Sequence, residues 1–123
     1  MPTKAVEKRA FERFPIPTLI DLELDNKTYH HEFSTNISES GIYIETDRLL
    51  PVGTKASMRF AVPHLDWVFE IQSIVMWIVQ VTSDQKLDGK KDGMGFSFLS
   101  MDATDKEKFH TYMKNFKIKD LEL

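Results

Sequence analysis

Apolar and polar residues alternate along several short segments of this chain. The clearest case begins at residue 20, where acidic residues separate Ile20, Leu22 and Leu24. A period of two places successive side chains on opposite faces of a strand, so this segment is predicted to be a half-buried β-strand. Turn-forming residues at 25–27 lead to a second predicted strand at 28–33, and the two strands are expected to form a hairpin.

More strand-like segments follow. They are predicted at residues 41–45, 55–62 and 95–99, and a long β-branched and aromatic stretch at 67–81 is predicted to be one bent strand or two. Residues 36–40 and 50–53 are expected to be a loop and a turn, because they are rich in turn-forming residues. The charged segment at 84–92 is expected to be a solvated loop.

The period changes near the C-terminus. Apolar residues there recur with helical spacing, at Phe109, Tyr112, Met113 and Phe116. Thr104 and Glu107 fit a capping box, and Asp102 and Asp105 suit the start of a helix. The whole pattern predicts an all-β fold of six or seven antiparallel strands, closed into a small barrel with one C-terminal α-helix packed on it.

Composition narrows the class of protein. The chain has 123 residues, the size of one domain, and 41% of them are hydrophobic. The predicted organisation is a flexible N-terminal arm at 1–14, a barrel with its helix at 15–117, and a tail at 118–123. A net charge of −3 argues against a general DNA or RNA binder.

Two further features bear on location. The chain has no cysteine, which excludes disulfides and thiol catalysis and makes the cytoplasm the expected compartment. Its longest apolar run, at residues 74–79, is too short to span a bilayer, so no membrane insertion is expected.

The predicted arm carries a pair of arginines, Arg9 and Arg13, in an R-x-x-x-R pattern. Arginine presents a planar fork that pairs with phosphate or with a guanine edge, and its plane stacks on a purine. Alone, the pair also fits an exposed helical turn in which Glu7 and Glu12 form ion pairs with basic neighbours.

A second motif, N-x-S-x-x-G, follows one hairpin later as Asn36, Ser38 and Gly41. The two short polar side chains suit a base edge or a phosphate oxygen. Glycine can adopt a backbone conformation closed to other residues, and its missing side chain lets a ligand approach. Alone, the segment also fits an ordinary turn.

Together, in this order and spacing, the two motifs resemble those of the PilZ domain, a bacterial receptor for cyclic di-GMP (c-di-GMP). The resemblance covers about residues 8–116, including strand-like segments at 75–77 and 93–98. It implies a six-stranded antiparallel barrel with a C-terminal helix, and c-di-GMP bound on the outer face. It also implies that Arg9 and Arg13 wrap guanine and phosphate, that Asn36 and Ser38 hydrogen-bond a guanine, and that Gly41 holds the loop's shape.

The chain departs from the family pattern at two positions. Lys8 stands where many members have another arginine, which leaves open whether one nucleotide or two are bound. Ser40 replaces a frequent glycine, a mild change. Both are secondary candidates for the ligand site. Ligand is expected to order the arm against the barrel and so signal to an unidentified effector protein.

The sequence also leaves room for other functions. One alternative is a PilZ-like interaction module that does not bind nucleotide. Another is a barrel for single-stranded nucleic acid, which the acidic balance disfavours. No catalytic motif is present, so no enzyme and no cofactor besides the ligand are predicted. His30 and His31 point to opposite faces of a strand, so no metal site is predicted. Trp67 is expected in the core rather than at a partner surface.

Overall fold

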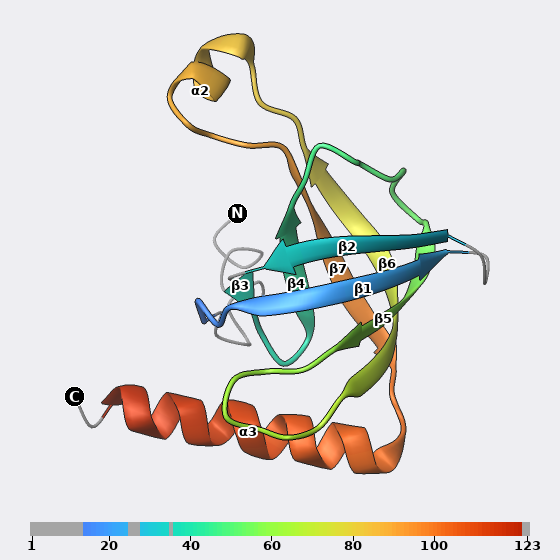
Figure 1. The fold of residues 1–123 in the computed structure, drawn as a ribbon, viewed down its shortest axis with the longest axis vertical. Helices are drawn as coiled ribbons and strands as arrows, with labels where there is room; N and C mark the ends of the chain where they lie inside the picture. Colours follow the sequence, from blue (N-terminus) through green and yellow to red (C-terminus); the bar gives the residue numbers. More distant parts are fainter. Residues whose placement is uncertain (1–13, 25–27, 35, 122–123) are drawn as a thin grey trace, which may run out of the picture.

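The fold is one antiparallel sheet that curls into a nearly closed barrel (Figure 1). The computed structural model describes residues 14–24, 28–34 and 36–121. The strands are β1 (Thr18–Leu24), β2 (Thr28–Ser34), β3 (Asn36–Ile37), β4 (Gly41–Glu45), β5 (Lys55–Phe60), β6 (Phe69–Val79) and β7 (Gly93–Ser100). Their order in the sheet is β2-β1-β5-β6-β7-β4-β3. The predicted antiparallel barrel is confirmed, with seven strands rather than six.

Two helices accompany the sheet. The long helix α3 (Ala103–Leu121) packs on the barrel, and the short helix α2 (Ser83–Leu87) lies in the β6–β7 connection, which projects away from it (Figure 1). The C-terminal helix is therefore confirmed, and it continues past residue 118, where the tail was predicted to begin. The segment at 84–92 was predicted to be a loop, but a capping box between Thr82 and Gln85 starts α2 there.

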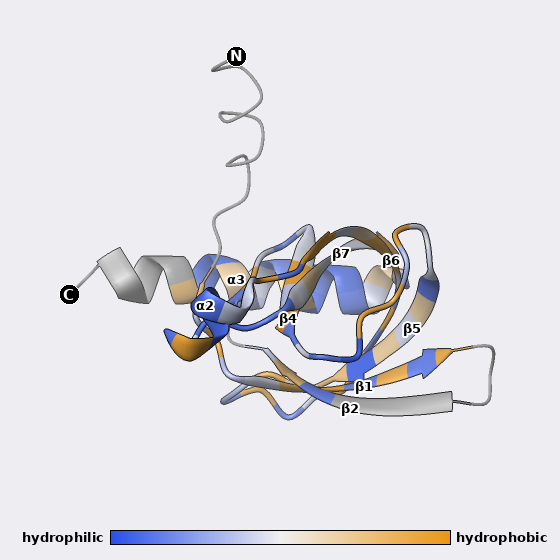
Figure 2. Ribbon diagram, turned by 90° about the horizontal axis from the view of Figure 1, so that it is seen from above, coloured by the Kyte–Doolittle hydropathy of each residue, from blue (hydrophilic) through white to orange (hydrophobic). Residues whose placement is uncertain are grey.

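The core lies inside the barrel, as the alternating pattern predicts. Ile20 and Leu22 of β1 and Ile42 and Ile44 of β4 are fully buried. Hydrophobic and hydrophilic bands alternate along β1 in Figure 2. The residues between these positions point outward, to the face of the sheet that a ligand can reach.

Helix α3 is fixed to the barrel by an aromatic cluster. The ring of Phe109 meets those of Phe60, Phe69 and Phe98 edge to face, with centroids 6.1, 5.3 and 5.8 Å away. Such edge-to-face pairs stabilise beyond the burial of their area. Phe109 and Met113 are 2% exposed, so the predicted apolar face of the helix is confirmed.

The start of α3 differs from the prediction. The Asp105 backbone N–H donates to Oδ1 of Asp102 at 2.8 Å, which makes Asp102 the N-cap. Thr104 therefore lies inside the first turn, and the capping box predicted for Thr104 and Glu107 is wrong. Asp102 is as good a cap as threonine and comes earlier in the chain.

Trp67 also differs from the prediction, since it lies at the surface and not in the core. Its side chain is 37% exposed, and its Nε1–H donates to Oδ1 of Asp105 at 2.8 Å. The ammonium group of Lys108 lies 4.4 Å from the ring centroid. An indole has one polar atom that needs a partner, and the start of α3 supplies it.

Candidate functional site

An isolated β-bridge joins Phe14, the residue that follows the first motif in the sequence, to Ile37, which lies inside the second motif. Lys8, Arg9 and Arg13 lie outside the described residues, but Phe14 directly follows Arg13 in the sequence. The Phe14 N–H donates to the Ile37 carbonyl at 2.8 Å, and the Ile37 N–H donates to the Phe14 carbonyl at 3.0 Å. Since Ile37 stands between Asn36 and Ser38, this bridge places the end of the arm beside the second motif.

The loop after Ile37 is held by the hydroxyl of Ser38. This side chain is 1% exposed, and its Oγ accepts the backbone N–H groups of Ser40 and Gly41, each at 3.2 Å. The Ser40 carbonyl in turn accepts the N–H of Phe98 at 2.9 Å. Ser38 and Ser40 therefore shape the loop, and the guanine contact predicted for Ser38 stays a prediction.

Gly41 is required for a reason that the sequence did not reveal. The backbone φ values that are positive at glycine belong to Gly53 and Gly89, so Gly41 does not use a conformation closed to other residues. A Cβ atom on Gly41 would instead lie 2.2 Å from the carbonyl oxygen of Phe96 on β7. Its role is to let β4 and β7 approach, so the prediction that Gly41 is needed for its backbone conformation is wrong.

Asn36 borders a surface of two aromatic rings. It pairs in register with Tyr43 of β4, whose ring stacks with that of Trp77 of β6 at a centroid distance of 6.4 Å and an interplanar angle of 19°. Beneath them lie Gly93 and Gly95 of β7, where an added Cβ would meet the Tyr43 hydroxyl and the Trp77 ring at 2.2 Å. We call these four residues, Tyr43, Trp77, Gly93 and Gly95, the outer aromatic face.

The outer aromatic face was not predicted as a site. Trp77 is 40% exposed, so part of its ring lies at the surface of the barrel. The alternation of glycines at 93 and 95 is the signal that could have indicated it, because glycine in a strand often marks close approach by another group. The rings are positioned by contacts between three strands, which the sequence does not encode locally.

The hydroxyl of Tyr43 is neutral at physiological pH. Burial raises the pKa of this phenol above its ordinary value, and the negative charges of Glu45 and Asp92 raise it further. The outer aromatic face therefore offers a hydrogen-bond donor and no negative charge from this ring.

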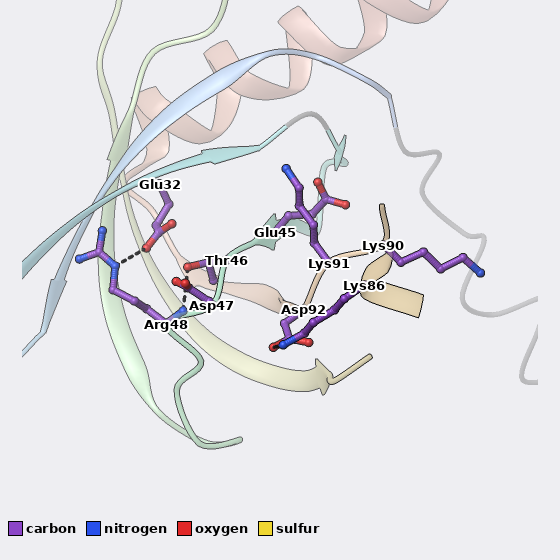
Figure 3. Close-up of a pocket in the computed structure, with 9 residues that line it drawn as sticks. All are labelled: Glu32, Glu45, Thr46, Asp47, Arg48, Lys86, Lys90, Lys91 and Asp92. Carbon is purple, nitrogen blue, oxygen red and sulfur yellow. Dashed lines mark hydrogen bonds and ion pairs between the residues drawn. The ribbon is translucent and has the colours of Figure 1, made fainter. Parts of the chain in front are cut away.

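A hollow of about 490 Å³ lies at the rim of the barrel, near the α2 connection (Figure 3). We call it the rim hollow; it is lined by Glu32, Glu45, Thr46, Asp47, Arg48, Lys86, Lys90, Lys91 and Asp92. Its four acidic and four basic side chains balance in charge. Arg48 Nε lies 3.6 Å from Glu32 Oε2, and Lys86 Nζ lies 3.9 Å from Asp92 Oδ2. The described residues of the two motifs do not line it.

Two further features concern the part of the chain that the structure describes. There, no group of three or more His, Asp or Glu side chains is arranged to hold a metal ion. The described helices also include none that is long and apolar enough to cross a membrane.

Comparisons with solved structures give the same fold. MotI/DgrA of Bacillus subtilis, an inhibitor of motility, matches with a TM-score of 0.74 and 17% identity over 90% of this chain and 52% of that chain. The PilZ domain of YcgR from Escherichia coli, solved with c-di-GMP, matches with a TM-score of 0.65 and 16% identity over 94% and 95%. MrkH, a c-di-GMP-dependent transcription regulatory factor, matches with a TM-score of 0.68 and 10% identity over 88% and 50%.

The chain thus spans about half the length of MotI/DgrA and of MrkH. No curated protein matches its sequence significantly. The model of the PilZ domain family, in contrast, matches residues 7–115, which include both motifs, all strands of the barrel and the first part of α3. The chain therefore belongs to the PilZ domain family.

Proposed function

We propose that this chain is a receptor for c-di-GMP, which binds on the outer side of the barrel beside residues 36–41. This segment runs from β3 through the turn into the start of β4, and we call it the 36–41 loop. The observation that carries the proposal is the Phe14–Ile37 bridge, because it holds the residue after Arg13 against the centre of the second motif. On this proposal, two motifs that are weak separately supply one surface. The c-di-GMP bound to the PilZ domain of YcgR supports the same ligand class.

Each motif has a distinct role in this proposal. Arg9 and Arg13 pair with phosphate and guanine from the arm, with Lys8 adding charge, because guanidinium forks match both partners. Asn36 offers an amide to a guanine edge. Ser38, Ser40 and Gly41 keep the loop backbone in place through the contacts described above, so that Asn36 stays on the ligand side.

The outer aromatic face supplies a stacking surface for a guanine. It adjoins Asn36 through the Asn36–Tyr43 pair, so a base that contacts the amide can lie over the rings. Stacking of a base on an aromatic side chain contributes about 1–3 kcal/mol. A flat nucleotide is thereby favoured over a small inorganic anion.

The signal arises from the arm. Ligand that contacts both arm and barrel holds the arm in one position and so creates a composite surface for an effector protein in the cytoplasm. It can shift this equilibrium only by its differential affinity for the two states. Amide hydrogen exchange in residues 1–13 should slow when c-di-GMP is added; equal protection with and without ligand would contradict this step.

Isothermal titration with c-di-GMP tests the receptor assignment. The wild-type chain should bind saturably, with a stoichiometry that distinguishes one nucleotide from two. Arg13→Ala should weaken binding about 5- to 150-fold, since a bidentate guanine contact contributes about 1–3 kcal/mol. Arg59→Ala is the matched control, because Arg59 is an exposed β5 residue that pairs with Glu70 at 3.2 Å. A folded wild-type chain that gives no binding would support the nucleotide-independent interaction module instead.

A further inference from the structure

The 36–41 loop is connected to helix α3 by one polar contact. Oε2 of Glu39, in the middle of the loop, lies 2.9 Å from Nδ1 of His110 on α3, 71 residues later in the sequence. Glu39 takes no part in the Ser38 hydroxyl contacts that hold the loop backbone. Its side chain is therefore oriented from outside the loop, by the helix.

His110 has a fixed position from which to do this. The preceding residue, Phe109, is 2% exposed and packs in the aromatic cluster, which sets the rotation of α3 on the barrel. A second contact joins the same helix to the arm: the rings of Phe14 and Phe116 meet edge to face at 5.0 Å. Helix α3 thus contacts the residue that follows the first motif and a residue inside the second.

The contact has an electrostatic consequence for an anionic ligand. Glu39 places a carboxylate in the loop where the proposed function puts a dinucleotide with two phosphates, and like charges repel. His110 donates to that carboxylate or pairs with it as a cation, which holds it toward α3. The side chains of Glu39 and His110 are 30% and 61% exposed, so the pair adds little to folding stability.

We infer that His110 is a positioning residue of the nucleotide site, which acts by holding the Glu39 carboxylate on α3 and screening its charge, so that it opposes the phosphates less. This inference rests on the proposed function. It assigns a role in the site to a helix that carries neither motif. It also makes Glu39 a residue whose effect on affinity depends on its partner.

Titrations of c-di-GMP into the full chain test the inference with a double-mutant cycle. His110→Ala should weaken binding roughly two- to five-fold, the range that an exposed pair supports. His110→Gln keeps a side-chain donor and should retain more affinity. In a Glu39→Gln background, His110→Ala should have no effect, because no carboxylate remains to be held. Thr111→Ala, at the neighbouring exposed position, is the control for changes to the helix itself and should bind as wild type.

Two results would overturn this inference and leave the proposed function standing. One is wild-type affinity in His110→Ala; the other is an equal loss from His110→Ala with Glu39 and with Gln at position 39, which would show a general effect of the helix. Absence of binding by the folded wild-type chain overturns the proposed function and this inference with it. Circular dichroism confirms that each variant is folded.

Discussion

The outer aromatic face and the rim hollow differ in the side chains that they present to a ligand. On the outer aromatic face, Tyr43 and Trp77 lie over glycines and present ring surface beside the 36–41 loop. In the rim hollow, acidic and basic side chains are balanced and partly paired across the cavity, as between Arg48 and Glu32. Concavity alone therefore does not mark the better site for a flat anionic ligand. Such a ligand needs open ring faces and cations that are not already neutralised.

Removing one ring of the outer aromatic face should have the largest effect. Trp77→Ala should weaken c-di-GMP binding by roughly 5- to 150-fold in isothermal titration, because base–aromatic stacking contributes about 1–3 kcal/mol. Trp67→Ala is the matched control, since Trp67 has similar exposure but lies against α3. Equal losses of affinity in the two variants would show that the outer aromatic face is not the binding surface for c-di-GMP.

A methyl group at Gly41 should lower the stability of the barrel next to the same site. Gly41→Ala places a Cβ against the Phe96 carbonyl and should lower the free energy of unfolding by about 1–3 kcal/mol, the range for overpacking. Denaturant unfolding measures this loss. Ser40→Ala, at an exposed position in the loop, should change stability by less than about 0.5 kcal/mol. An undiminished midpoint in Gly41→Ala would show that β4 and β7 separate without penalty.

A substitution in the rim hollow should lower the stability of the protein without changing its affinity for c-di-GMP. Arg48→Ala leaves the Glu32 carboxylate, which is 7% exposed, without its cation and should lower stability by about 1 kcal/mol. Affinity for c-di-GMP should not change. Lys90→Ala, which removes an exposed charge from the same hollow, should leave both quantities unchanged. A large loss of affinity in either variant would indicate that c-di-GMP binds in the rim hollow instead of at the outer aromatic face.

The smallest expected effect is a pH dependence from Tyr43. Its pKa is raised from 10.0 by burial and by Glu45 and Asp92, so the neutral phenol is favoured in the folded state. The stability that this group contributes is present below pH 10 and is lost as pH rises through the raised value. Tyr43→Phe should therefore flatten the fall in unfolding midpoint above pH 10. Tyr112, whose pKa is also raised by burial, remains in both proteins. An identical pH profile would contradict the shift at Tyr43.

Much of the fold follows from the sequence because it depends on local periodicity. Alternation located β1 and β4, and helical spacing located the buried face of α3 at Phe109 and Met113. Elements that are too short for a period were missed: β3 has two residues, and α2 has five. The two motifs were found because their residues are close together in the chain.

The remaining features of the site depend on contacts between distant segments. Gly41 is required by Phe96 on another strand, and the Trp77 ring lies over Gly95. The contact between Glu39 and His110 spans 71 residues. A single sequence gives the residue types at these positions but not the distances between them, so the physical roles of these residues could only be read from the structure.

Backbone-amide NMR during a c-di-GMP titration shows directly which surface binds the nucleotide. If c-di-GMP binds at the outer aromatic face, the largest shift changes are expected at Asn36, Gly41 and Gly95 and at the indole N–H of Trp77, with small changes at residues 46–48 in the rim hollow. Saturable changes centred on residues 46–48 and 90–92, with the outer aromatic face unmoved, would contradict it.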